Sequence, residues 1–146
     1  MPTKPDSWLE GRHQFPVYYE DTDFSGYVFH ANYLKYFERA REELVGLQYV
    51  KELYERGVHY VVYKMDLTFH APAKHGDIIT VDSRLRLSES PVGLVHQTCL
   101  IVDPNDPSKE LTKLCSAKIR LATVDNQGEP MRVPKDIVDH FASLIK

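Results

Sequence analysis

The pattern of hydrophobic and polar residues changes its period along the chain, and each change marks a predicted element. Between residues 31 and about 47, apolar side chains recur every three or four positions, which is the spacing of one helical face. Tyr36 widens that face, so we expect the helix to be covered on more than one side. A shorter helical segment is predicted at 48–56, ending at Gly57. The main apolar stripe consists of Tyr33, Phe37, Ala40, Leu44 and Leu47.

After Gly57 apolar and polar positions alternate, which indicates strands. Residues 58–69 predict a long half-buried strand, because their odd-numbered positions are apolar from residue 61 onward. Three more strands are predicted at about 79–87, 94–102 and 111–121. Turns rich in proline, glycine, asparagine, aspartate and serine separate them. Short turns between long strands indicate antiparallel pairing.

The two ends of the chain complete the predicted fold. Residues 1–13 are expected to be a loose lead-in and residues 14–20 a strand, which Pro16 would confine to a sheet edge. A short helix is expected from Pro134 onward. A helix and a sheet with apolar faces must bury each other, so the predicted fold class is α+β, in one domain of residues 1–146. We expect a long central helix wrapped by an antiparallel sheet of about five strands.

Composition narrows the possible partners. The formal net charge of −3 gives no reason to expect nucleic acid or an anionic membrane surface. No segment approaches the roughly 20 apolar residues that span a bilayer, and the first residues lack the apolar core of a signal peptide. We therefore expect a cytoplasmic protein with no membrane span. Cys99 and Cys115 lie in predicted strands and are expected to be reduced and buried.

Candidate chemistry is concentrated in the acidic loop that leads into the long helix. This loop carries two carboxylates, Asp21 and Asp23, and an imidazole, His30. The helix is predicted to begin at about Ala31 or Asn32, with Asn32 as a candidate N-cap. Unpaired N–H groups and the helix dipole at such a terminus stabilise developing negative charge. Aspartates before a helix also commonly act as caps, and we assign Asp21 to that structural role.

Other common site types have no matching pattern. The remaining histidines lack metal-ligand spacing, and no His-Glu-x-x-His occurs, so we expect no metal. There is no Gly-x-Ser-x-Gly elbow, no phosphate-binding glycine loop and no dinucleotide fingerprint. We therefore expect no cofactor.

An ordered set of motifs resembles the hot-dog-fold acyl-CoA thioesterases, in particular the YbgC-like branch of the 4-hydroxybenzoyl-CoA thioesterase family. The order of the predicted elements agrees with that fold over nearly the whole chain. Ala71-Pro72-Ala73 followed by Gly76-Asp77 also resembles the second turn of the family. The main motif block consists of Tyr19-Glu20-Asp21-Thr22-Asp23, Gly26, Val28, His30-Ala31-Asn32-Tyr33-Leu34 and Phe37-Glu38-Arg39-Ala40-Arg41.

This resemblance implies hydrolysis of an acyl-CoA thioester to a carboxylic acid and free coenzyme A. Asp23 matches the catalytic aspartate, as general base for water or as nucleophile toward the carbonyl. His30 and Tyr19 match positions near that carboxylate, and Gly26 would let the backbone approach the substrate. The pair Phe24-Ser25 departs from the small residues of the family and bears on the range of acyl groups. The implied substrate-binding positions are Gly26, Val28, Phe24 and Asn32.

The resemblance also implies partners and alternatives. Hot-dog enzymes pair edge to edge, so we expect a homodimer and further assembly to a homotetramer, with each active site built across the dimer. Coenzyme A, or an acyl carrier protein in its place, belongs to the substrate. The alternatives are a hot-dog protein that binds acyl-CoA without hydrolysis and a hot-dog hydroxyacyl-thioester dehydratase. The thioesterase hypothesis requires Asp23 to face a cavity at the start of the helix. Candidate ligands for the phosphates of coenzyme A are Lys74, Arg84, Arg86 and Lys118.

Overall fold

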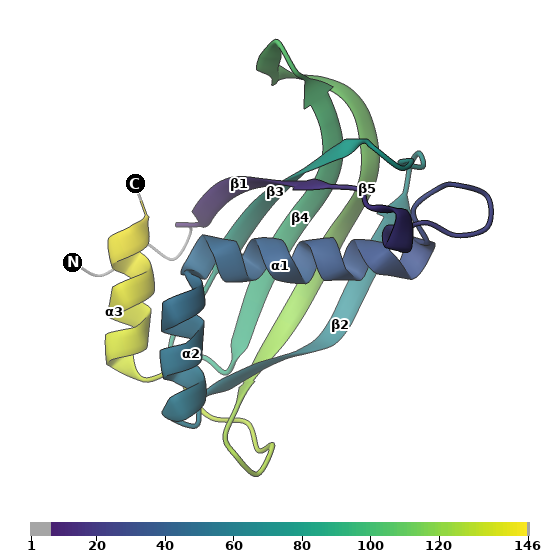
Figure 1. Ribbon diagram of the computed structural model, residues 1–146. Coiled ribbons are helices and arrows are strands. Elements are labelled where there is room, and N and C mark those ends of the chain that lie inside the picture. Colours follow the sequence, from purple (N-terminus) through teal and green to yellow (C-terminus); the bar gives the residue numbers. More distant parts are fainter. Residues whose placement is uncertain (1–6, 146) are drawn as a thin grey trace.

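One long helix lies along the concave face of a curved five-stranded sheet (Figure 1). The computed structural model describes residues 7–145. The sheet is antiparallel throughout, in the order β1-β3-β4-β5-β2, so β1 and β2 form its two edges. Its strands are β1 (Leu9–Pro16), β2 (His59–Phe69), β3 (Ile78–Arg86), β4 (Val92–Asp103) and β5 (Asp106–Val124).

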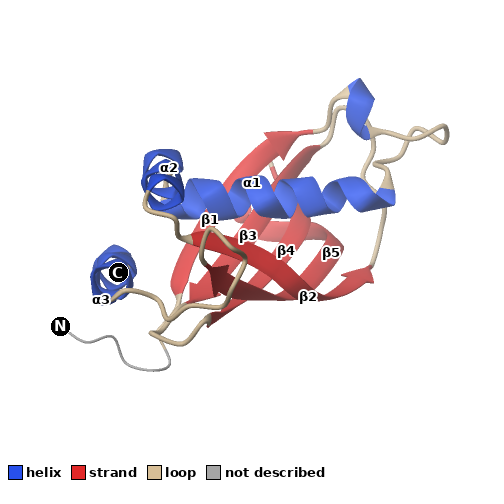
Figure 2. Ribbon diagram, turned by 90° about the horizontal axis from the view of Figure 1, so that it is seen from below, coloured by secondary structure: helices blue, strands red, loops and turns tan. Residues whose placement is uncertain are grey.

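The central helix α1 (Tyr33–Val45) follows a short 3-10 turn, η2 (His30–Asn32). At its carboxyl end the chain turns at Gly46 into α2 (Leu47–Glu55), which covers one end of the sheet beside α3 (Lys135–Leu144) (Figures 1 and 2). Another 3-10 turn, η1 (Tyr19–Asp21), lies at the opposite end of α1. The predicted long helix, the short helix after it, the four later strands and the terminal helix are all confirmed.

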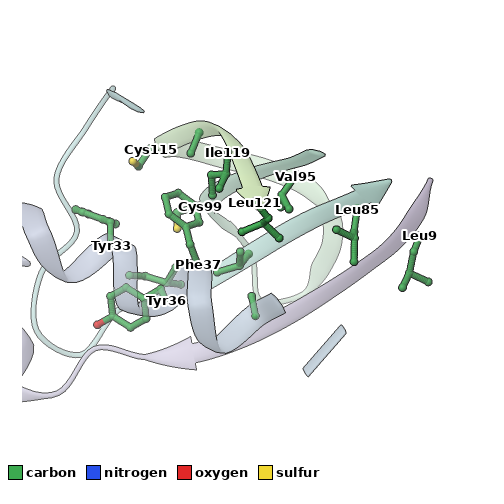
Figure 3. Packing of buried hydrophobic residues seen from close by; sticks show 14 of the residues in the cluster. Leu9, Tyr33, Tyr36, Phe37, Leu85, Val95, Cys99, Cys115, Ile119 and Leu121 are labelled. Atoms are coloured by element: carbon green, nitrogen blue, oxygen red, sulfur yellow. The ribbon is translucent and has the colours of Figure 1, made fainter. Parts of the chain in front are cut away.

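The core lies between α1 and the inner face of the sheet (Figure 3). The helix contributes Tyr33, Tyr36 and Phe37, all almost fully buried. Cys99 on β4 and Cys115 on β5 are directly paired across these strands, and both are buried free thiols, as predicted. Burial raises the pKa of Cys115 to about 12 and raises that of Cys99 further.

The first strand was predicted in the wrong place. It spans Leu9–Pro16 and pairs with β3, so part of the expected lead-in is a strand. Between Leu9 and Phe15 its inward positions are Gly11 and His13, so the apolar period-two pattern is interrupted there. Tyr18 and Tyr19 favoured a strand at 14–20, but both are exposed, and Tyr19 opens the turn η1.

The prediction for β2 was right about the strand and only partly right about its burial, because Met65 and Leu67 pack against the core but the other predicted positions are exposed. Apart from β5, no strand of the described residues pairs with it, and it exposes Val61, Val62, Tyr63 and Phe69. A free edge with four exposed apolar side chains favours pairing of β2 with another strand. Within residues 7–145, no helix is both long enough and apolar enough to cross a bilayer.

Candidate active site

The acidic loop forms a small closed turn beside the start of α1. The Asp23 N–H donates to the Tyr27 carbonyl at 2.8 Å, and the Gly26 N–H donates to the Asp23 carbonyl at 3.1 Å. Gly26 has a φ of 87°, in the region that glycine adopts most readily. A side chain at this position would meet no atom within 4 Å, so the glycine serves the backbone turn rather than a tight space.

Asp21 holds this loop against the helix. Its backbone carbonyl accepts from the Phe29 N–H and from the Asn32 side-chain amide, both at 2.9 Å. Its buried carboxylate accepts from the Tyr18 N–H at 2.9 Å. The expected capping role of Asn32 is therefore wrong, because its side chain donates back to the loop and makes no cap bond to α1.

Val28 fastens the far side of the loop. Its side chain is buried in the core, and its N–H donates to the Ala73 carbonyl at 2.8 Å. The loop is thus anchored at Asp21 and Val28, while its tip, residues 23–26, is exposed.

The Asp23 carboxylate faces solvent and is bound by its own loop. It accepts hydrogen bonds from the Ser25 N–H, at 2.8 Å, and from the Ser25 hydroxyl. These bonds, with a smaller electrostatic contribution from His30, hold the pKa of Asp23 below its ordinary value. Asp23 is therefore ionised at neutral pH. Sequence reasoning noted Ser25 only as a departure from the family, although Asp-x-Ser often forms this turn.

The other predicted catalytic residues lie at the same end of α1, without a preformed bond to Asp23. The His30 ring packs on Phe29 at 4.6 Å and meets Phe69 of β2 edge-on at 6.3 Å between centroids. Tyr19 is exposed, with its ring 6.3 Å from that of His75. Within the described residues no hydrogen bond joins either side chain to Asp23. Phe24, at the loop tip, is fully exposed.

Two cavities bordering the described residues lie away from this loop. One cavity of about 860 Å³ lies beside α3, and another of about 490 Å³ lies beneath α2. Neither is lined by a loop residue from Asp21 to Asn32. Because Asp23 is exposed, a thioester held there would lie at the surface of one chain.

The four candidate phosphate ligands separate into two places. Lys74 pairs with Tyr27 of the loop through a bridge of backbone hydrogen bonds, and it is exposed. Arg84, Arg86 and Lys118 lie on the sheet face that points away from α1. Only Lys74 is next to the loop. In the described residues no group of three metal-ligating side chains is placed to hold an ion.

Residues 17–141 match the family model of the thioesterase-like superfamily, and the chain belongs to that family. It is 32% identical over 128 residues to the acyl-CoA thioester hydrolase YbgC of Escherichia coli, covering 86% of this chain and 90% of that protein. It is 34% identical over 122 residues to the acyl-CoA thioesterase YbgC of Helicobacter pylori, covering 82% of this chain and 90% of that protein.

The fold is the predicted hot-dog fold. The 4-hydroxybenzoyl CoA thioesterase from Pseudomonas sp. strain CBS-3 superposes with a TM-score of 0.76 over 90% of this chain and 99% of that chain. Its sequence identity of 16% means that this likeness concerns the fold alone.

Proposed function

We propose that this protein hydrolyses an acyl-CoA thioester to a carboxylic acid and free coenzyme A, with Asp23 as the residue that acts on the thioester. The observation that carries the proposal is the ionised, accessible Asp23 carboxylate held beside the start of α1. The two YbgC relatives carry the name of this activity and cover more than four fifths of the chain.

The chemistry needs a base or nucleophile and a group that stabilises the oxyanion. Asp23 either takes a proton from the attacking water or attacks the carbonyl carbon itself. With water, the new carbon–oxygen bond forms, the carbon–sulfur bond breaks, and the proton held by Asp23 passes to the departing thiolate. No side chain caps α1 or η2 in the described residues, and the helix dipole at this terminus would polarise the carbonyl.

The accessory residues have supporting roles in this proposal. His30 lies next to Phe69 and close enough to Asp23 to favour its ionised form, so it is suited to carrying a proton. Tyr19 would orient the substrate or the carboxylate from the exposed side of the loop. Gly26 and Phe24 form the loop tip that a thioester would touch, whereas the buried Val28 supports the loop.

Two copies joined along β2 would build each site across the dimer. The free edge of β2 and its exposed apolar side chains support antiparallel pairing about a twofold axis near the middle of the strand. Such pairing sets the first residues of one β2 beside the last residues of the other. Phe69, which contacts His30, would then lie at the interface. The homotetramer stays a prediction.

Lys74 is the proposed ligand for a phosphate of coenzyme A. It is exposed and attached to the Asp23 loop through Tyr27, whereas the other three candidates lie on the far face of the sheet. An acyl carrier protein, which also presents its acyl group on a phosphopantetheine arm, stays an alternative carrier.

The test is release of free thiol from a panel of acyl-CoAs by the wild type and by Asp23→Asn. We expect the variant to keep its fold and lose about 10²–10⁴-fold in turnover, the range for removal of a catalytic acid–base group. Asp139→Asn, an exposed change on α3, is the matched control and should retain full activity. Near wild-type thiol release from Asp23→Asn would remove Asp23 from the mechanism.

Two other outcomes would redirect the assignment. Saturable acyl-CoA binding with no thiol release across the panel would indicate a binding protein. An enoyl product from a hydroxyacyl-CoA, seen by its absorbance, would indicate a dehydratase.

A further inference from the structure

The larger cavity lies at the opposite end of the molecule from the Asp23 loop, beside α3 (Figure 1). Residues of α3, of the turn that joins β3 to β4 and of the start of β1 line it. Its volume of about 860 Å³ is within the range of small-molecule sites. None of the residues that we assign to the reaction, Tyr19, Asp23 and His30, lines it. A ligand in this cavity would therefore occupy a site separate from that of the reaction.

Most of this lining is apolar. Leu9, Leu85 and Phe141 are buried and form its closed part. A hydrocarbon chain that covers the remaining apolar side chains would remove apolar surface from water on both partners, which is the main driving force for binding such a chain. These remaining side chains are half-buried, namely Leu87, Leu94, Val138, Ala142 and Ile145.

The charged residues of the lining carry an excess of positive charge. Arg86, Arg132 and Lys135 lie there with two carboxylates, Glu89 and Asp139. Glu89 is already paired with Arg132, at 3.2 Å. Among residues 7–145, no carboxylate lies within 4 Å of Arg86 or Lys135. A head group with one negative charge would therefore balance the lining, and a guanidinium can bind a carboxylate through two parallel N–H bonds.

Trp8 holds the Arg86 guanidinium in place at this cavity. The central carbon of that guanidinium lies 4.7 Å from the centroid of the Trp8 ring, and the central carbon of Arg84 lies 4.5 Å from the same centroid. Arg84 donates to Glu10 at 3.0 Å. Stacking on an indole fixes the plane of a guanidinium and leaves its N–H edge available to a ligand. Arg86 is therefore preorganised to bind a carboxylate.

His96 also lies in this positively charged region. Its ring lies 5.0 Å from that of Trp8. Burial lowers the pKa of His96, and the positive charges of Lys118, Arg84 and Arg86 lower it further. An anion bound to Arg86 would offset part of this positive potential, so the pKa of His96 would rise.

We propose that the cavity beside α3 binds a fatty acid, with its carboxylate on Arg86 and its hydrocarbon chain along the apolar lining between α3 and the β3–β4 turn. The stacked guanidinium favours a charged head group over a neutral lipid. The single excess positive charge favours a carboxylate over a phosphate monoester, which carries nearly two negative charges at neutral pH. The inference does not depend on the proposed thioesterase function, because binding needs no turnover.

The first experiment uses Trp8, the only tryptophan of the chain, as a fluorescent probe beside Arg86. Titration of the full-length protein with dodecanoate should give a saturable change in fluorescence. Dodecanol, which has the same chain and an uncharged head, should bind about tenfold or more weakly. Butanoate covers little apolar surface and should not saturate the site. Equal affinities for dodecanoate and dodecanol, or no saturable binding of dodecanoate, would overturn the proposal.

The second experiment locates the ligand with variants, whose affinities are measured by calorimetry. Arg86→Gln should weaken dodecanoate binding about tenfold and leave dodecanol binding nearly unchanged. Ala142→Phe, which fills the cavity from α3, should weaken the binding of both ligands about tenfold. Arg120→Gln is the matched control, because it removes an exposed cation of the same sheet that does not line the cavity. An unchanged dodecanoate affinity in Arg86→Gln would show that the ligand binds elsewhere, and the proposal would be wrong.

The pKa of His96 tests the position of the head group independently. Followed by NMR, it should rise when dodecanoate saturates the protein, because the carboxylate offsets the neighbouring positive charges. A pKa that stays the same on saturation would mean that the carboxylate does not lie at Arg86.

Three further outcomes separate this site from the proposed active site and from an interface. Asp23→Asn should bind dodecanoate with wild-type affinity, and a changed affinity would indicate binding at the thioesterase site instead. An altered oligomeric state in Ala142→Phe, with dodecanoate affinity unchanged, would indicate that a second copy covers this face and would overturn the fatty acid site. A wild type that binds dodecanoate but releases no thiol from any acyl-CoA would support this site and contradict only the proposed function.

Discussion

The two ends of α1 divide the properties of an active site between them. The amino end has an ionised carboxylate, an imidazole and a tightly bonded loop. The carboxyl end has an apolar cavity of about 490 Å³, and none of the proposed catalytic groups lines it. Neither end is a complete site by itself. In the proposed dimer a twofold axis across β2 would bring unlike ends together, so activity would depend on the free strand edge.

The largest expected effect comes from preventing two copies from pairing along β2, which would keep the unlike ends of their α1 helices apart. Val62→Asp places a charge on the exposed face of the free edge strand, where two copies would repel each other. We expect a monomer with about a hundredfold less thiol release, because a misplaced substrate loses most of its positioning. Light scattering and the thiol assay measure both effects. Leu111→Asp is the control. A monomer with full activity would contradict the idea that the site needs two copies.

A smaller effect is expected from loosening the amino end alone. Asn32→Ala removes the amide that bonds to the Asp21 carbonyl at 2.9 Å. We expect stability to fall by about 1 kcal/mol. Turnover should fall about tenfold with little change in KM, because the loop moves relative to the helix. Thermal melts and steady-state kinetics test this. Asn105→Ala, in the hairpin turn, is the control and should change neither stability nor turnover. An unchanged kcat in Asn32→Ala would show that Asn32 does not position the loop.

A change at Lys74 tests how the carrier is held. Lys74→Glu should raise KM for acyl-CoA about fivefold at low salt, a modest effect because the side chain is exposed. The same acyl group on N-acetylcysteamine, which carries no phosphate, should show no change. Arg84→Glu, on the far face of the sheet, is the control. An equal rise for both thioesters would mean that Lys74 does not bind phosphate.

The smallest effect at neutral pH is expected from Ser25→Ala. The Ser25 bonds lower the pKa of Asp23, so their removal raises it toward the ordinary value. Since the reaction needs ionised Asp23, the acidic limb of kcat/KM should move to higher pH, with little change at pH 7. Ser108 makes the same pair of bonds to Asp106, at 3.2 and 2.6 Å, so Ser108→Ala is a matched control. An acidic limb that does not move would exclude Asp23 as its source.

Most of the fold could be predicted from the sequence, but only part of the candidate site could. Apolar spacing located α1, α2, the four later strands and α3, because each has one strongly patterned face. It missed the start of β1, where glycine and histidine occupy inward positions, and it could not tell that β2 lies at an edge. Burial of a strand depends on which strands pair with it, and that is a long-range property.

Prediction from the sequence reached a similar limit at the Asp23 loop. Its motif residues were visible in order, but the bond from Asn32 back to Asp21 depends on how the loop folds onto the helix. The cavity beneath α2 also could not be predicted from the sequence, because its walls come from α1, α2, α3 and three strands. Local patterns identify candidate chemistry, whereas the space for a substrate emerges only from the assembled chain.

The paired cysteines of the core have a practical consequence. Because Cys99 and Cys115 are fully covered and their raised pKa values keep them protonated, the native protein should not react with disulfide reagents such as Ellman's compound. Yellow colour in a turnover assay then reports coenzyme A alone. In denaturant, the same two sulfhydryls become a built-in gauge of how much of the sheet has opened.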